Sequence, residues 1–213
     1  MNKKPEIFQL ATSVVHELRN QLGVIDLAVY NLKREKGDLA DNKHLLNIEK
    51  NVWEANYMVT NFLSYMRIKE PSYVKVPIVD LLDQCILSVQ DILGDQGIII
   101  DKQYDKTLPC IEADSNQIRD VFFNILINAC QSLKKSGGNI ELRVELKETL
   151  VQVSIQDAGP GIVKELGLDM LLCHELVNLH QGKIEIIPQK GLGTKVIVLL
   201  PIHHKDVLVE KGQ

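Results

Sequence analysis

Aromatic residues, cysteines and long apolar runs are all scarce in this sequence of 213 residues. Phe, Trp and Tyr together make up 5% of the chain, so its core must be built mainly from aliphatic side chains. No stretch approaches the ~20 apolar residues of a membrane-spanning helix, and the first residues lead into no apolar signal-peptide segment. We therefore expect a soluble, cytoplasmic chain, either complete or the cytoplasmic portion of a longer protein.

The cysteines and the charges exclude several further classes of protein. The four cysteines form no CxxC pair, which excludes the usual zinc motifs and the dense pattern of a disulfide framework. The net charge is −4 and no long basic block is present, which argues against nucleic acid or an anionic membrane as a partner. With 45% hydrophobic residues, the chain has the composition of a globular protein with one large or two small domains.

The N-terminal third carries apolar residues at alternating steps of three and four, the spacing of helices that pack against other helices. Residues 6–35 predict one such helix and residues 45–66 a second, with a break at 37–42. We expect a helical hairpin over residues 1–70. Because two helices alone bury too little apolar surface, we expect it to dimerise into a four-helix bundle.

After a proline-bracketed linker at 71–77, helical and alternating patterns follow one another. They predict an α+β fold, with an α/β sandwich over residues 78–202 and a C-terminal tail at 203–213. Asp114 is placed to cap a long helix that ends near residue 137. The other expected helices span 79–93 and 168–179, and the expected strands span 98–104, 139–147, 150–156, 183–187 and 194–200.

A possible nucleophile lies on the first helix, in the segment His16-Glu17-Leu18-Arg19-Asn20. An imidazole on the polar side of a helix titrates near neutrality and can attack phosphorus. Glu17 is placed to accept a proton from one ring nitrogen. Asn20, one turn further on, is placed to orient a water that cleaves a phosphoryl group from a partner. The alternative is an ordinary solvated helix surface, the better reading for this motif in isolation.

A more specific pattern lies in the middle of the chain, where Asp120, Asn124 and Asn128 recur every four residues. This spacing places them in one stripe on a helix whose remaining surface is apolar. Burying such a stripe without ligands is costly, so we expect it to face a cleft. Its oxygens suit a Mg²⁺ ion that bridges nucleotide phosphates, with Asn128 and Asp120 as ligands. The alternative is that the asparagines cap neighbouring loops.

The segment Asp157-Ala158-Gly159-Pro160-Gly161 directly follows an expected strand. A carboxylate at this exit can accept a hydrogen bond from an exocyclic amine, and glycines let the backbone approach a planar ring. Taken alone, the pattern is more often a plain loop than a nucleotide site. Residues 191–194, before the last strand, give a weaker signal that also suits a hairpin turn.

In this order the motifs resemble the dimerisation and ATP-binding domains of bacterial two-component sensor histidine kinases, over about residues 8–201. The resemblance implies a homodimer with a Bergerat-type ATPase domain. It also implies ATP and Mg²⁺ as cofactors, ATP-dependent autophosphorylation and phosphoryl transfer to a response-regulator aspartate, with regulator dephosphorylation as a further activity. It makes His16 the phosphoacceptor, Glu17 its acid/base assistant and Asn20 the dephosphorylation residue. It assigns nucleotide binding to Asp120, Asn124, Asn128, Asp157, Gly159, Gly161, Gly167 and Thr194.

Two departures from the family pattern bear on activity. Gln21 replaces the proline that usually follows Asn20, which weakens the expected helical kink. Only five residues separate Gly161 from Gly167, where family members place a long ATP lid, so the lid is deleted or minimal. Phosphoryl transfer depends on positioning, to which the lid contributes.

Two interpretations follow from these motifs. In the first, the chain is a histidine kinase that binds ATP with a minimal lid. In the second, it is an ATP-independent histidine phosphotransferase or scaffold whose degenerate ATPase-like domain binds a response regulator. The preserved asparagine stripe and the Asp157 loop favour the first interpretation, and the missing lid favours the second.

Overall fold

The computed structural model describes residues 4–35, 42–93, 97–133, 137–161, 167–189 and 191–204. The chain divides into two compact units, residues 1–68 and 69–213, which are described separately below. Within the described ranges, no helix is both long enough and apolar enough to cross a membrane. Residues 162–166, where the sequence predicts a minimal lid, lie outside the described residues, as do residues 205–213 of the expected tail.

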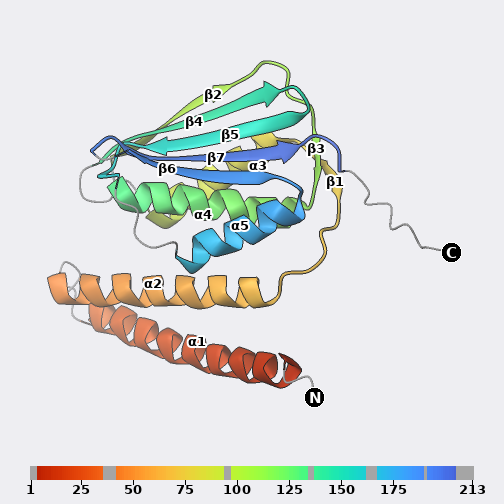
Figure 1. The fold of residues 1–213 in the computed structure, drawn as a ribbon. Helices are drawn as coiled ribbons and strands as arrows, with labels where there is room; N and C mark the ends of the chain where they lie inside the picture. Colours follow the sequence, from red (N-terminus) through yellow and green to blue (C-terminus); the bar gives the residue numbers. More distant parts are fainter. Residues whose placement is uncertain are drawn as a thin grey trace. The chain divides into compact units, whose positions relative to one another are not determined.

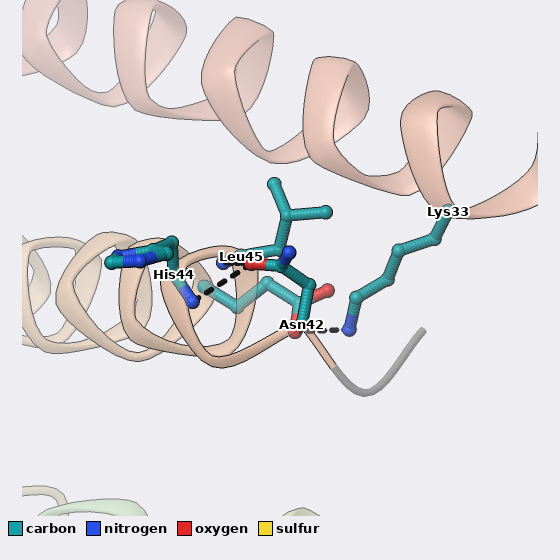
Figure 2. Close-up of polar contacts among 5 residues, drawn as sticks. Lys33, Asn42, His44 and Leu45 are labelled. Atoms are coloured by element: carbon teal, nitrogen blue, oxygen red, sulfur yellow. Dashed lines mark hydrogen bonds and ion pairs between the residues drawn. The ribbon is translucent and has the colours of Figure 1, made fainter. Parts of the chain in front are cut away.

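The first unit is the predicted helical hairpin, formed by α1 (Lys4–Glu35) and α2 (Lys43–Met66). Asn42 caps α2, because its Oδ1 accepts hydrogen bonds from the backbone N–H of His44 at 2.9 Å and of Leu45 at 3.3 Å. Beside this cap, Lys33 Nζ of α1 lies 2.7 Å from Glu49 Oε2 of α2, a contact that joins the two helices (Figure 2).

The hairpin buries only part of its apolar surface. Val29 of α1 and Val52 of α2 are buried, at 4% and 6% exposure. In contrast, Leu18, Ile25 and Leu32 of the predicted seam are 49%, 43% and 44% exposed. These three residues are spaced seven apart and so lie on one face of α1, where a packing partner could cover them.

The second unit is a sheet covered by helices, which confirms the predicted α+β class (Figure 1). Its main sheet has five strands in the order β2-β4-β5-β7-β6, and α3, α4 and α5 lie along one face. The β2–β4 pair is parallel and the other pairs are antiparallel. The elements are α3 (Ile78–Leu93), β2 (Ile98–Tyr104), α4 (Ser115–Leu133), β4 (Gly138–Lys147), β5 (Leu150–Asp157), α5 (Leu168–Leu179), β6 (Lys183–Gln189) and β7 (Gly193–Pro201).

Two short strands were not predicted. β1 (Val74–Val76) and β3 (Ile111–Ala113) form an antiparallel pair of their own. β1 lies inside the segment that the sequence predicts as a linker, 71–77, so this segment is partly a strand of the second unit. Three residues are too few to show a period of two, and the flanking prolines of the segment favour an irregular connection.

The core of the second unit lies between the sheet and α4. Alternate residues of β4 and β5 point toward the helices, as a half-buried sheet requires. Phe122 and Leu126 of α4 are fully buried at 0% exposure. The strand residues of this core are Ile140, Leu142, Val144, Val151, Val153 and Ile155, each at most 1% exposed. The core is therefore almost entirely aliphatic, as the scarcity of aromatic residues predicts.

Candidate functional site

Helix α4 carries the polar stripe, and Asp114 caps the N-terminal end of this helix. The Asp114 Oδ1 atom accepts hydrogen bonds from the backbone N–H of Asn116 at 3.0 Å and of Gln117 at 3.1 Å, which confirms the predicted cap. Its Oδ2 atom accepts from the backbone N–H of Ser72 at 3.0 Å. Burial alone would raise the pKa of Asp114, but the hydrogen bonds from Ser72, Gln117 and Asn116 lower it.

The three residues of the stripe differ in their exposure. Asp120 is exposed, Asn128 is half-buried and Asn124 is buried at 3% exposure. Although Asp120 lies at the surface, desolvation by the surrounding protein raises its pKa, while Arg119 next to it has the opposite effect. The stripe thus runs from solvent at Asp120 into the protein at Asn124, and becomes partly accessible again at Asn128.

Helix α5 packs against this stripe through Cys173. The Cys173 thiol donates to the Val121 carbonyl oxygen at 3.6 Å. Burial raises the thiol pKa, the nearby Asp169 carboxylate raises it further, and a hydrogen bond with Asn124 lowers it. Asn124 therefore has a neighbour on α5, and the Cys173 thiol is a packing group.

Asn128 makes a short contact across to the first turn of α5. Its Nδ2 atom donates to Asp169 Oδ2 at 2.5 Å. Gly167 is the N-cap residue of α5, and Asp169 is the acidic residue of the first turn. A carboxylate at this end of a helix is stabilised by the helix dipole. The structure thus brings Asn128 to the helix start that carries the predicted Gly167.

Asp157, at the end of β5, is buried at 5% exposure and held by two donors. Its Oδ1 atom accepts from the Ser132 hydroxyl and from the backbone N–H of Gly159, both at 2.8 Å. Among the residues that the structure describes, none donates to Oδ2. Both hydrogen bonds go to Oδ1, so Oδ2 can still accept one from a ligand. A buried carboxylate of this kind suits a ligand that carries an N–H donor.

The backbone after Asp157 packs tightly enough to require glycine. A Cβ atom at Gly159 would lie 2.6 Å from Ser132 Oγ and 2.7 Å from Asp157 Oδ1. Gly161 has a φ of +66°, and a Cβ atom there would overlap the carbonyl oxygen of Gln189. The loop is therefore held between α4 and the β6–β7 hairpin. Thr194 lies in that hairpin, where it pairs with Pro188, and no described contact links it to Asp157.

The predicted residues of the hairpin are described only in part. The side chains of His16 and Glu17 lie outside the described residues, although both positions belong to α1. Asn20 is exposed on α1. Next to it, Arg19 Nη2 donates to Thr60 Oγ1 of α2 at 3.0 Å. Asn20 is thus accessible to solvent, and the adjacent Arg19 side chain is hydrogen-bonded to α2.

Sequence reasoning missed Ser132, Asp169 and His180. Ser132 continues the stripe at the next step of four residues, so the spacing was a usable signal. Asp169 gives no distinctive signal, because an acidic residue in a first helical turn ordinarily only stabilises the helix. His180 is buried at 2% exposure; Nδ1 lies 2.8 Å from the Leu176 oxygen, and Nε2 accepts from the Asp114 N–H at 3.0 Å.

The donor set fits a Mg²⁺ ion that is shared with a ligand better than an ion caged by the protein. In the described part of the chain, no group of three or more His, Cys, Asp or Glu side chains is arranged to hold a metal ion. Mg²⁺ in nucleotide sites usually takes one or two protein oxygens, with phosphate and water completing its shell. Asn128, whose amide nitrogen is already committed to Asp169, has its oxygen left for this purpose.

Comparison with known proteins gives matches over both units. Residues 113–204 match the family described as histidine kinase-, DNA gyrase B- and HSP90-like ATPases. The chain is 26% identical over 212 residues to the signal transduction histidine-protein kinase AtoS of Escherichia coli, covering 92% of this chain and 35% of the relative. It is 27% identical over 210 residues to sporulation kinase A of Bacillus subtilis, covering 88% and 34%. The chain therefore spans about a third of the length of these relatives.

Two solved structures share the fold at low identity. Full-length ShkA in complex with AMPPNP superposes with a TM-score of 0.69 at 19% identity, covering 92% of this chain and 46% of that chain. The histidine kinase ThkA in complex with the response regulator protein TrrA gives a TM-score of 0.65 at 21% identity, covering 91% and 61%. Both likenesses extend over the helical hairpin and the sheet unit.

Proposed function

Because this chain belongs to the two-component sensor histidine kinases and carries a Bergerat-type ATPase domain, we propose that it binds Mg²⁺-ATP between the α4 stripe and the Asp157 loop and phosphorylates itself on His16. The observation that carries the proposal is the geometry of Asp157. Ser132 and Gly159 hold one carboxylate oxygen of this buried residue and leave the other for a ligand donor.

Each residue has a distinct role in this proposal. Asp157 Oδ2 accepts a hydrogen bond from the exocyclic amine of the base, and Gly159 and Gly161 allow the loop to approach the ring. Asn128 is the proposed protein ligand of Mg²⁺, which would neutralise phosphate charge when it is bound. Asp120 lies eight residues away on α4, roughly 12 Å along the helix axis, which is too far to bind the same ion. Asn124 anchors the stripe to α5 through its hydrogen bond with the Cys173 thiol. Gly167 offers backbone N–H groups at the start of α5 to the phosphates, and Thr194 lines the neighbouring hairpin.

The receiving end of the reaction lies on α1. His16 accepts the phosphoryl group, with Glu17 as the acid/base assistant, and passes it to an aspartate of a response-regulator receiver domain. Asn20, which is exposed, orients water for regulator dephosphorylation. The exposed apolar residues Leu18, Ile25 and Leu32 support a homodimer, because a second hairpin would cover them in a four-helix bundle. We place this activity in the cytoplasm, where the nucleotide and the regulator are found.

One observation favours a second function, that of an ATP-independent histidine phosphotransferase or scaffold. Only five residues connect Gly161 to Gly167. A connection of this length leaves little chain to cover bound phosphates and exclude water from them. In this alternative the second unit binds a response regulator, and His16 receives its phosphoryl group from a phosphorylated receiver domain.

Calorimetry separates the two functions. Mg²⁺-ATP and Mg²⁺-ADP are titrated into the wild type, Asp157→Asn and the control Asp101→Asn, which makes the same chemical change at an exposed position on β2. Binding by the wild type and the control, with loss in Asp157→Asn, supports the kinase. If the wild type binds neither nucleotide, the kinase proposal fails, and phosphoryl transfer from a labelled receiver domain to His16 tests the alternative.

A further inference from the structure

We infer that Asp169 is a positioning residue, which holds the amide of Asn128 in the one orientation that presents its oxygen to a metal ion. The inference rests on the proposed nucleotide site and adds to it a residue that the sequence motifs do not mark. It starts from the 2.5 Å hydrogen bond between Asn128 Nδ2 on α4 and Asp169 Oδ2 on α5.

The chemistry of the two groups determines the orientation of the amide. An ionised carboxylate only accepts hydrogen bonds, whereas a carboxamide donates from one end and accepts at the other. Asn128 must therefore turn its NH₂ group toward Asp169, and its Oδ1 atom must point away. Turning the amide over would bring two acceptor oxygens together and lose the hydrogen bond. A charge-assisted bond of this kind is stronger than a neutral one.

Asp169 is itself held in place. It lies in the first turn of α5, where the helix dipole stabilises a negative charge. It is half-buried, and its carboxyl group lies against Gly167, since a Cβ atom there would overlap Asp169 Oδ1. Any side chain at position 167 would displace the carboxylate. The start of α5 is thus shaped to place Asp169 against Asn128.

The Asp169 carboxylate also has a second effect on nucleotide binding, opposite in sign to its positioning of Asn128, and the two effects can be measured separately. Its negative charge at the start of α5 repels phosphate groups, so removing it would strengthen nucleotide binding if repulsion dominated. A positioning role predicts the opposite result in the presence of Mg²⁺. Groups that orient metal ligands typically contribute tenfold to 100-fold in metal affinity. We propose that this contribution exceeds the repulsion, because Mg²⁺ offsets the phosphate charge.

The test compares wild type, Asp169→Ala, Asp169→Asn, Asn128→Ala and the Asn128→Ala/Asp169→Ala double variant. Each is titrated with adenosine, with Mg²⁺-ATP and with ATP in EDTA, and its Tm is recorded. We expect Asp169→Ala to weaken Mg²⁺-ATP binding tenfold or more and to leave adenosine affinity unchanged. Asp169→Asn should show a similar loss, because a carboxamide at 169 fills the same volume but no longer dictates which way Asn128 faces. The double variant should bind no more weakly than Asn128→Ala.

Three results would overturn the inference. Tighter or unchanged Mg²⁺-ATP binding by Asp169→Ala would show that repulsion dominates or that the contact is irrelevant. Additive losses in the double variant would show that Asp169 does not act through Asn128. A parallel loss of adenosine affinity and Tm would indicate a role in folding alone. If the wild type binds neither adenosine nor Mg²⁺-ATP, the proposed function fails and this inference fails with it; binding of both with no effect of Asp169 overturns the inference alone.

Discussion

Gly193 at the start of β7 lies directly against the backbone carbonyl oxygen of Asp157 at the end of β5, so closely that a Cβ atom at Gly193 would overlap that oxygen. The φ angle of Gly193 is +103°, a region that side chains rarely adopt. The β6–β7 hairpin therefore packs against the backbone of Asp157, the residue that we propose recognises the base.

We predict that Gly193→Ala destabilises the protein and weakens adenosine binding, because the added methyl group pushes the Asp157 backbone away. Gly191→Ala is the matched control: its φ is +77°, but nothing lies within 4 Å of an added Cβ. The control should cost about 1–2 kcal/mol through backbone strain alone, and Gly193→Ala should cost more. Urea denaturation and adenosine titration measure the two effects. Equal losses in both variants would contradict the close packing.

A second prediction concerns the cap of α4. Asp114→Ala removes the acceptor for Asn116, Gln117 and Ser72, and should lower the free energy of unfolding by about 0.5–2 kcal/mol. Asp114→Asn retains a capping oxygen and should lose less. Urea denaturation at pH 7 measures both variants. If Asp114→Asn is as unstable as Asp114→Ala, the cap contributes nothing and the carboxylate charge accounts for the whole effect.

The elements of the second unit were predictable wherever the apolar pattern is long. The helix expected over residues 168–179 is α5, and the strand expected over 98–104 is β2. Both have enough turns or alternations for their period to be visible. β1 and β3 escaped prediction because three residues show no period, and their pairing joins segments far apart in the chain.

One part of the candidate site was predictable from local sequence spacing, and the other part was not. Asp120, Asn124 and Asn128 share one helix, so their spacing of four residues is sufficient to place them in a stripe. The partners of that stripe lie on other elements: Asp169 at the start of α5 meets Asn128 only because α5 packs on α4. Local spacing carries no information about that packing, which depends on the core between the sheet and the helices.

A third prediction follows from His180, whose pKa is lowered by burial, although the hydrogen bond with the Leu176 oxygen and the Asp114 carboxylate act in the opposite direction. The folded protein therefore binds a proton on His180 more weakly than the unfolded chain, where the pKa is about 6.5. The stability that neutral His180 contributes is fully present above about pH 6.5. It declines as the pH falls further, until the pH reaches the pKa of His180 in the folded protein. The limiting slope is about 1.4 kcal/mol per pH unit.

His180→Gln removes this titration, so the loss of stability between pH 8 and pH 5.5 should be smaller in the variant than in the wild type. The variant will be less stable at every pH, because Gln cannot reproduce both ring hydrogen bonds; the informative quantity is the change with pH. His44→Gln, which makes the same chemical change at an exposed position in α2, is the control. Identical pH profiles for His180→Gln and the wild type would remove His180 as the titrating group.

The fourth prediction concerns phosphoryl acceptance. His16→Ala should abolish labelling of the chain by any donor, whether γ-labelled ATP or a phosphorylated receiver domain, because the imidazole nitrogen is the proposed nucleophile. The fold should be unaffected, since position 16 lies within α1 and alanine is the strongest helix former. Acid-labile labelling and circular dichroism measure the two outcomes.

Asn20→Ala gives the matched control, because it lies one turn from His16 on the same helix and is exposed. This variant should still accept the phosphoryl group on His16, and it should slow only the dephosphorylation of the regulator. The two donors also separate the two proposed functions, because labelling by the receiver domain without labelling by ATP identifies a phosphotransferase. Labelling of His16→Ala by either donor would show that another residue is the acceptor, and the relay would then have to be assigned to a different side chain.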